Sequence, residues 1–167
     1  MSMAEAMVEG LDLANAGAVV EYGPGTGVFT GKILERVSPS TRFLAIEISP
    51  RLAAIFREQY PDVPLAEDSV ANVGRLCAEA GIVSVDVIVS GLPWAAFPDS
   101  LQRELLDATM SVLRPGGTFV TFAYLHGLPL PAGRRFRKLL GEYFSSVRRS
   151  DIVWPNLPPA LVYRCIR

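Results

Sequence analysis

Three alternating glycines mark the stretch of this 167-residue chain that is best suited to hold a ligand. The stretch follows an apolar run and reads Glu21, Tyr22, Gly23, Pro24, Gly25, Thr26 and Gly27. Glycine has no Cβ and reaches positive φ, so a ligand can approach such a backbone closely. The dinucleotide fingerprint G-x-G-x-x-G would place its third glycine at position 28, which is Val28. The spacing therefore argues against a bound dinucleotide.

Two acidic positions further along the chain fit a ligand that contains a nucleoside. Glu47 ends the second apolar run, 20 residues after Gly27, and Ile48 follows it. A carboxylate at that place can accept hydrogen bonds from both ribose hydroxyls. Asp68 and Ser69 follow the third apolar run. By itself this pair suits a helix N-terminus as well as it suits a ligand contact.

The glycine loop, the two acidic positions and the segment RPGG at 114–117 resemble, in that order, the motifs of Rossmann-like S-adenosylmethionine-dependent methyltransferases. The resemblance implies that S-adenosylmethionine is the cofactor and that the loop surrounds its methionine and ribose portions. Glu47 would bind the ribose, and Asp68 would meet the adenine amino group. The implied cofactor-binding residues are Glu21, Tyr22, Gly23, Pro24, Gly25, Thr26, Gly27, Glu47, Ile48, Asp68, Ser69 and Ser90. The resemblance implies no metal ion.

The fourth apolar run leads into the candidate catalytic segment, Ser90, Gly91, Leu92, Pro93 and Trp94. In the resembled family this strand end faces the methyl group of the cofactor. The rRNA adenine dimethylases carry [N/D]-[L/P]-P-[aromatic] here, and their Asn or Asp accepts a hydrogen bond from the target amine. Enzymes that act on a flipped base recognise it by hydrogen bonds to its edge. Gly91 has no side chain that could accept such a bond. This departure argues against methylation of adenine N6.

The segment SGLP instead resembles bacterial phospholipid N-methyltransferases that act on phosphatidylethanolamine. Those proteins carry the motif W-x-N-L-P-P-A-x-V-Y-R near their C-terminus, and residues 154–164 here read WPNLPPALVYR. The resemblance implies methylation of the headgroup amine of phosphatidylethanolamine. Trp94 would then offer an aromatic face to the ammonium group, with Tyr22 and Tyr124 as weaker candidates. His126, the single histidine, is interpreted as a loop residue.

Three other functions stay open at this point. They are methylation of adenine N6 in rRNA or another nucleic acid, methylation of a small molecule, and binding of S-adenosylmethionine without catalysis. The short N-terminal region favours the last, because the resembled phospholipid enzymes carry a longer region that includes an amphipathic helix. Residues 3–13 here, MAEAMVEGLDL, look like the end of such a helix.

Charge is distributed unevenly along the chain. Residues 1–130 hold 8 Lys or Arg against 15 Asp or Glu, whereas residues 131–167 hold 8 against 2. The basic residues of the second part cluster at Arg134, Arg135, Arg137, Lys138, Arg148 and Arg149. Such a segment suits an anionic lipid surface, RNA phosphates or plain solvation. A phospholipid and an anionic membrane surface are the expected partners, RNA is the alternative, and nothing indicates a stable protein partner.

Apolar runs that alternate with helical patterns must position these residues. Strands are predicted at 18–22, 42–47, 63–66, 85–90 and 118–124, and helices at 26–37, 49–60, 69–80 and 99–113. A basic helical stretch at 134–144 and two strands, near 145–152 and 160–166, follow. Strands that alternate with helices form parallel sheets. We therefore expect one α/β, Rossmann-like domain over residues 1–167, with seven strands, mostly parallel, and an antiparallel C-terminal strand.

Composition restricts the compartment. No apolar run approaches the 18 residues of a transmembrane helix. The start has no basic region before an apolar core, as a signal peptide would. Cys77 and Cys165 match neither a disulfide framework nor a paired metal spacing. We expect a cytoplasmic protein, peripheral on the inner face of the membrane if its acceptor is a lipid.

Overall fold

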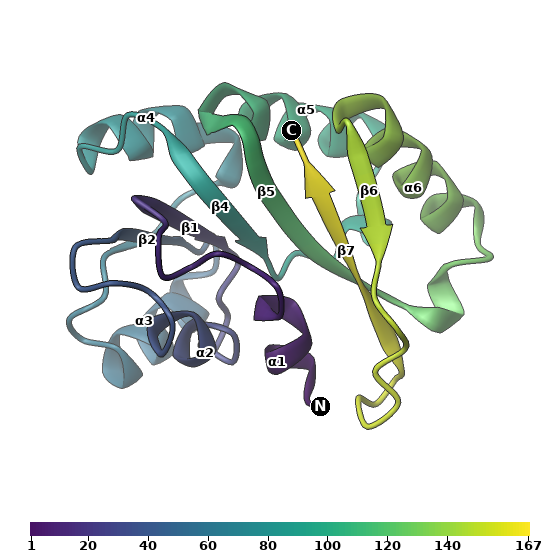
Figure 1. The fold of residues 1–167 in the computed structure, drawn as a ribbon, viewed down its shortest axis with the longest axis horizontal. Coiled ribbons are helices and arrows are strands. Elements are labelled where there is room, and N and C mark those ends of the chain that lie inside the picture. Colours follow the sequence, from purple (N-terminus) through teal and green to yellow (C-terminus); the bar gives the residue numbers. More distant parts are fainter.

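Seven strands lie side by side in one sheet at the centre of the computed structural model, which describes residues 1–167 (Figure 1). The strands are β1 (Ala18–Tyr22), β2 (Arg42–Ile46), β3 (Leu65–Ala66), β4 (Val85–Ser90), β5 (Leu113–Tyr124), β6 (Ser146–Arg149) and β7 (Ala160–Ile166). Their order across the sheet is β3-β2-β1-β4-β5-β7-β6. β7 is antiparallel to both of its neighbours, and the pairs among β1 to β5 are parallel. The predicted fold class is confirmed.

Helices cover both faces of this sheet. They are α1 (Met3–Val8), α2 (Thr30–Leu34), α3 (Pro50–Gln59), α4 (Val73–Glu79), α5 (Asp99–Val112) and α6 (Pro131–Tyr143), with the 3-10 helices η1 (Val70–Asn72), η2 (Trp94–Ala96) and η3 (Leu125–Gly127). In Figure 1, α4, α5 and α6 lie on one side of the sheet and α1, α2 and α3 on the other. Two apolar clusters fill these layers, one of 25 buried residues beneath α4 to α6 and one of 15 beneath α1 to α3. None of the helices has the length and apolar character that crossing a bilayer requires.

Several predicted elements begin or end elsewhere. The helix predicted at 26–37 is reduced to α2, because Gly27 has a φ of 85° and donates its N–H to the Pro24 carbonyl at 2.8 Å, so the loop takes up the first turns. The helix predicted at 69–80 is divided into η1 and α4. The helix predicted at 99–113 ends at Val112, because Leu113 is already the first residue of β5 and pairs with Val85. The segment 114–117 lies within β5 as well.

The strand ends bring the candidate residues together. Tyr22, the last residue of β1, pairs with Ile46 of β2 on one side and with Ser90 of β4 on the other. The glycine loop, Glu47 and residues 91–94 therefore leave the sheet at the same edge. This carboxyl edge is where open parallel sheets bind their ligands.

Candidate active site

Each glycine of the loop meets a different constraint. Gly23, Gly25 and Gly27 all have positive φ, at 60°, 58° and 85°. A Cβ on Gly23 would lie 2.7 Å from Leu92 Cδ2, and a Cβ on Gly27 would collide with the ring of Tyr60. A Cβ on Gly25 would meet nothing within 4 Å. Gly25 therefore has open space beside it. The space beside Gly23 is filled by Leu92, and the space beside Gly27 is filled by Tyr60.

Glu47 connects this loop to the end of β2. Its Oε2 accepts a hydrogen bond from the Gly25 N–H at 3.1 Å, and its Oε1 accepts one from the Ser49 N–H at 2.9 Å. The side chain is buried. A carboxylate offers about four acceptor positions, so two backbone donors leave capacity for hydroxyl donors of a ligand.

Asp68 is more strongly engaged within the protein than Glu47. Its Oδ1 accepts hydrogen bonds from the Ser69 N–H at 2.6 Å and from Asn72 Nδ2 at 2.8 Å, and its Oδ2 pairs with Arg75. The hydrogen bond from Asn72 is the largest of the interactions that lower the pKa of Asp68. Asp68 therefore organises the start of η1, whether or not it also touches a ligand.

A cavity of about 180 Å³ lies between the glycine loop and α5. Its lining includes five of the predicted cofactor-binding residues, namely Gly23, Glu47, Ile48, Asp68 and Ser69. The remaining lining is apolar and consists of Ile46, Val70, Leu92, Phe97, Leu101 and Leu105. Sequence reasoning missed this apolar wall, because the inward face of an amphipathic helix such as α5 has the same pattern whether it meets a core or a cavity.

Tyr22, predicted to be part of the cofactor site, does not line this cavity. Its side chain is fully buried in the core, and its hydroxyl lies 3.2 Å from Thr109 Oγ1 on α5. What Tyr22 contributes at the sheet edge is its carbonyl, which accepts a hydrogen bond from the Gly91 N–H at 2.8 Å. This bond fixes the end of β4 against the glycine loop.

Glu21 carries a buried carboxylate with one unused oxygen. Its Oε2 accepts a hydrogen bond from Thr30 Oγ1 at 2.7 Å, whereas its Oε1 has no partner. Burial raises the pKa of Glu21 to about 7. A buried acceptor without a partner is uncommon in folded proteins and suits a donor that the chain itself does not supply.

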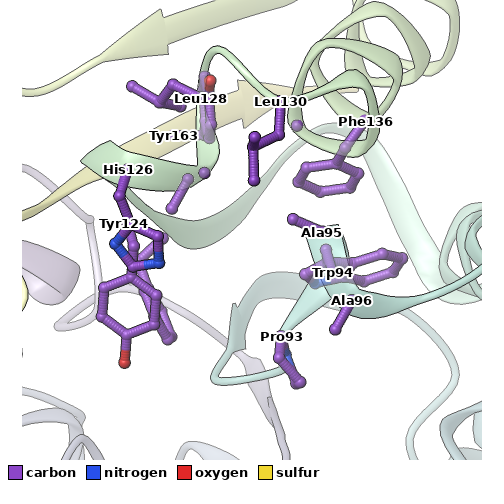
Figure 2. Close-up of a pocket in the computed structure, with 14 residues that line it drawn as sticks. Pro93, Trp94, Ala95, Ala96, Tyr124, His126, Leu128, Leu130, Phe136 and Tyr163 are labelled. Carbon is purple, nitrogen blue, oxygen red and sulfur yellow. The ribbon is translucent and has the colours of Figure 1, made fainter.

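A second cavity, of about 310 Å³, lies between η2, α6 and the end of β5. Figure 2 shows Trp94 and Phe136 along one side of it and Tyr124 with His126 along the other. Leu92 lines the first cavity, and Pro93 and Trp94 line the second. Residues 92–94 of the predicted catalytic segment therefore border both cavities.

Trp94 cannot offer the exposed aromatic face that was expected of it. The side chain is only 1% exposed, its ring stacks on Phe136 at 5.2 Å between centroids, and its Nε1 donates to Ser90 Oγ at 2.9 Å. Tyr22 is buried as well. Of the three aromatic candidates only Tyr124 is exposed, at 38%, and its ring stacks on His126.

Gly91 occupies a position that leaves no room for a side chain. A Cβ there would lie 2.7 Å from the Gly23 carbonyl oxygen and 3.4 Å from that of Tyr22. An asparagine at this place, as in the adenine dimethylases, would require the glycine loop to move. In this structure the backbone around position 91 therefore leaves no room for a side-chain acceptor.

The family follows from comparison with known proteins. Residues 19–117 match a family model described as a methyltransferase domain. The chain is 34% identical over 162 residues to an ornithine lipid N-methyltransferase of Singulisphaera acidiphila, and the alignment covers 95% of this chain and 80% of that protein. The chain belongs to the Rossmann-like, S-adenosylmethionine-dependent methyltransferases. The family predicted from the sequence is confirmed, and with it the cofactor.

Two further similarities place this methyltransferase among its relatives. It is 41% identical over 80 residues to ribosomal RNA small subunit methyltransferase A of Prosthecochloris aestuarii, a match that covers 47% of this chain and 30% of that protein. An O-methyltransferase of Bacillus cereus, solved in complex with S-adenosylhomocysteine, has the same fold with a TM-score of 0.78 and 13% identity, over 100% of this chain and 82% of that one.

The site of this methyltransferase fits its cofactor. The unpartnered Glu21 Oε1 suits an amino group, the open space beside Gly25 admits a ligand against the loop, and Glu47 retains acceptor positions for hydroxyl groups. No group of three or more His, Cys, Asp or Glu side chains is placed to hold a metal ion.

Proposed function

We propose that this methyltransferase transfers methyl groups to the primary amine of a membrane lipid headgroup. The observation that carries the proposal is the extent of the similarity to the ornithine lipid N-methyltransferase. The family model ends at residue 117, whereas an alignment over 95% of the chain must include most of the segment beyond it. That segment holds η3, α6 and β7, which contribute residues to the wall of the second cavity, beside Trp94.

The acceptor expected from the sequence was phosphatidylethanolamine. The long similarity is to a protein that acts on ornithine lipid, so the proposal covers both lipids. They share the chemistry that matters at this site, a primary amine close to a membrane surface. The test below separates them.

The second cavity, beside Trp94, favours the reactive form of such an acceptor. An alkylammonium group has a pKa of about 10 by analogy with lysine, and only the neutral amine has a lone pair to donate. Ten of the 14 residues that line the cavity are hydrophobic. Desolvation in these surroundings favours the neutral amine.

Positioning is the main contribution of the chain to the reaction. When bound, S-adenosylmethionine supplies an electrophilic methyl group on its sulfonium. Transfer is an in-line displacement, so the rate depends on holding the amine opposite the departing sulfur. Residues 90–94 are held for this purpose by the hydrogen bonds from Trp94 Nε1 to Ser90 Oγ and from the Gln102 side chain to the Trp94 carbonyl, at 2.9 and 2.7 Å.

The basic helix α6 supports a membrane as the partner. Arg134, Arg137 and Lys138 are exposed and form no ion pair, whereas Arg135 lies 3.9 Å from Asp99. The opposite face of the helix is buried through Phe136, Leu139 and Leu140. We propose that the three free cations attract anionic lipids and that the protein works at the inner face of the membrane.

Transfer of radiolabelled methyl groups from S-adenosylmethionine tests the proposal. The acceptors are vesicles with ornithine lipid, vesicles with phosphatidylethanolamine, phosphatidylcholine vesicles as the blank, and ribosomal subunits. We expect label in one or both amine lipids and none in RNA. Label in adenine but in no lipid would show that the acceptor is RNA. No label in any acceptor, despite tight binding of S-adenosylhomocysteine, would identify a non-catalytic relative.

A further inference from the structure

The loop between β6 and β7 presents two large apolar side chains to solvent. Trp154 is 65% exposed and Leu157 is 89% exposed. The other tryptophan, Trp94, is 1% exposed. Figure 1 shows this loop extending beyond the end of the sheet. Single exposed leucines are common, but a tryptophan and a leucine exposed together at a projecting tip suggest a contact surface.

Hydrogen bonds hold this loop in shape. The Val153 N–H donates to the Ala160 carbonyl at 2.8 Å, and Asn156 Nδ2 donates to the Pro158 carbonyl at 2.6 Å. Three of its positions are prolines, which have no N–H. The tip therefore has fewer backbone donors to desolvate when it enters an apolar medium, where unsatisfied donors are costly.

The loop also lies beside the second cavity, the one next to Trp94. Tyr124, at the end of β5, pairs with Ala160, at the start of β7, and the Leu125 N–H donates to the Pro159 carbonyl at 2.9 Å. Tyr124 and the exposed Leu130 are part of the cavity wall. Whatever surface the loop contacts is therefore brought close to the proposed acceptor site.

Charges next to the loop indicate the kind of surface. Arg148 and Arg149 of β6 precede it, are exposed, and form no ion pair. The one acidic residue between positions 145 and 160 is Asp151. These two arginines give the start of the loop a positive charge, and α6 adds three more exposed cations on the same C-terminal part of the chain. Tryptophan beside arginine is the combination that lies at the boundary between lipid headgroups and acyl chains.

We propose that Trp154 and Leu157 insert into the lipid bilayer and fix the protein with its acceptor cavity at headgroup level. The occupant is the surface of an anionic phospholipid bilayer. The role of this insertion rests on the proposed function, because only a lipid acceptor would have to enter the cavity from a membrane. The insertion itself is measured separately from methyl transfer.

The two tryptophans make a direct experiment available. Vesicles of phosphatidylcholine and phosphatidylglycerol contain no amine acceptor for the enzyme, and their brominated forms quench tryptophans that enter the acyl region. We expect brominated vesicles to quench the emission of the parent protein. In Trp154→Phe, the remaining emission of the buried Trp94 should be unaffected. Quenching that is equal in parent and Trp154→Phe would overturn the proposal.

Leu157→Asp tests the contribution of the tip to binding. We expect at least a tenfold weaker partition into the same vesicles in a sedimentation assay. Val83→Asp is the matched control, because Val83 is 98% exposed on the loop that precedes β4, at the opposite edge of the sheet. It should bind as the parent does. Equal binding by Leu157→Asp and parent would refute the insertion.

Two further measurements separate the outcomes. If the tip instead contacts a second copy of this chain, analytical ultracentrifugation without lipid would show a dimer that Leu157→Asp abolishes, and this result would overturn the proposal. If the tip inserts but no lipid amine is methylated, the insertion stands and the proposed function fails. If both hold, Leu157→Asp should lose activity on vesicles while keeping its activity on a short-chain, monomeric amine lipid.

Discussion

Gly91 lies so close to Gly23 that a Cβ on Gly91 would come within 2.7 Å of the Gly23 carbonyl oxygen. The segment predicted to face the acceptor and the loop predicted to face the cofactor therefore lie close together at these two glycines. We expect a side chain at position 91 to displace Gly23.

Gly91→Ala should damage cofactor binding. The added methyl group meets backbone, which cannot rotate away, and overpacking of this kind costs roughly 1–3 kcal/mol of stability. We expect at least a tenfold loss of affinity for S-adenosylhomocysteine by calorimetry, with a lower melting temperature. Gly141→Ala on α6, where a Cβ meets nothing within 4 Å, is the control and should be neutral or slightly stabilising. Unchanged affinity in Gly91→Ala would disprove the coupling.

Glu47→Gln should weaken the same ligand through lost charge-assisted hydrogen bonds. Removing such a bond costs about 1.5–3 kcal/mol, or roughly a 10- to 150-fold loss of affinity. Glu58→Gln, an exposed glutamate on the neighbouring α3, serves as the matched control and should bind as the parent does. Calorimetry with NAD completes the experiment, since tighter binding of NAD than of S-adenosylhomocysteine would contradict the assigned cofactor.

Glu21 should make the ligand-free protein less stable as the pH rises toward neutrality. Its pKa is raised by burial from 4.5 to about 7, so the folded state binds the proton more tightly than the unfolded state does. Its contribution is complete below about pH 4.5 and is lost as the pH rises through about 7. At about 1.36 kcal/mol per pKa unit, the upper limit of this loss is roughly 3 kcal/mol.

Glu21→Gln should therefore raise the melting temperature at pH 8 relative to the parent, and by more than at pH 5. Glu104→Gln, at an exposed position of α5, is the control and should leave the pH profile of the parent unchanged. A Glu21→Gln profile parallel to that of the parent would show that the carboxyl group titrates normally.

Ser90 and Trp94 should be energetically coupled. Ser90→Ala leaves the buried Trp94 N–H without its acceptor, and such a loss costs about 1–3 kcal/mol. Trp94→Phe removes the donor, so the double variant should be more stable than the sum of the single effects predicts. Urea unfolding of the parent, both single variants and the double variant measures this difference. Strict additivity would mean that the hydrogen bond contributes little.

Replacing Arg134, Arg137 and Lys138 together with glutamine should weaken binding to phosphatidylglycerol-rich vesicles by up to ~3 kcal/mol, at about 1 kcal/mol per cation. Affinity for S-adenosylhomocysteine should stay the same. Parent binding should also decrease with salt, because the Debye length falls from about 10 Å at 0.1 M to about 3 Å at 1 M. Arg51→Gln, an exposed arginine of α3, is the control. Binding by the triple variant equal to that of the parent would exclude α6 as the electrostatic contact.

The order of strands and helices was predictable because each strand is an apolar run with a clear stop, as β4 and its Ser90–Gly91 ending show. The sheet edge that gathers the glycine loop and Glu47 follows from that order. The burial of Trp94 did not follow from the sequence. Its stacking partner Phe136 comes from α6, 42 positions later, and only the packing of α6 on the sheet brings them together. The hydrogen bonds of Asp68 with Asn72 and Arg75 join residues that are close in the sequence. They were still not predictable, because an acidic residue after a strand has the same sequence pattern whether it binds a ligand or its own helix.

The position of β7 between β5 and β6 has a consequence for synthesis of the protein. β5 and β6 are made first, but neither hydrogen-bonds to the other, since β7 is the shared neighbour of both. During translation, the edge of β5 that faces away from β4 and both edges of β6 therefore stay without hydrogen-bonding partners until residues 160–166 have been made. Unpaired strand edges are templates for aggregation. A nascent chain that stalls before Ala160 thus leaves β5 unpaired on one side and β6 unpaired on both, and β7 then pairs with the facing edges of these two strands.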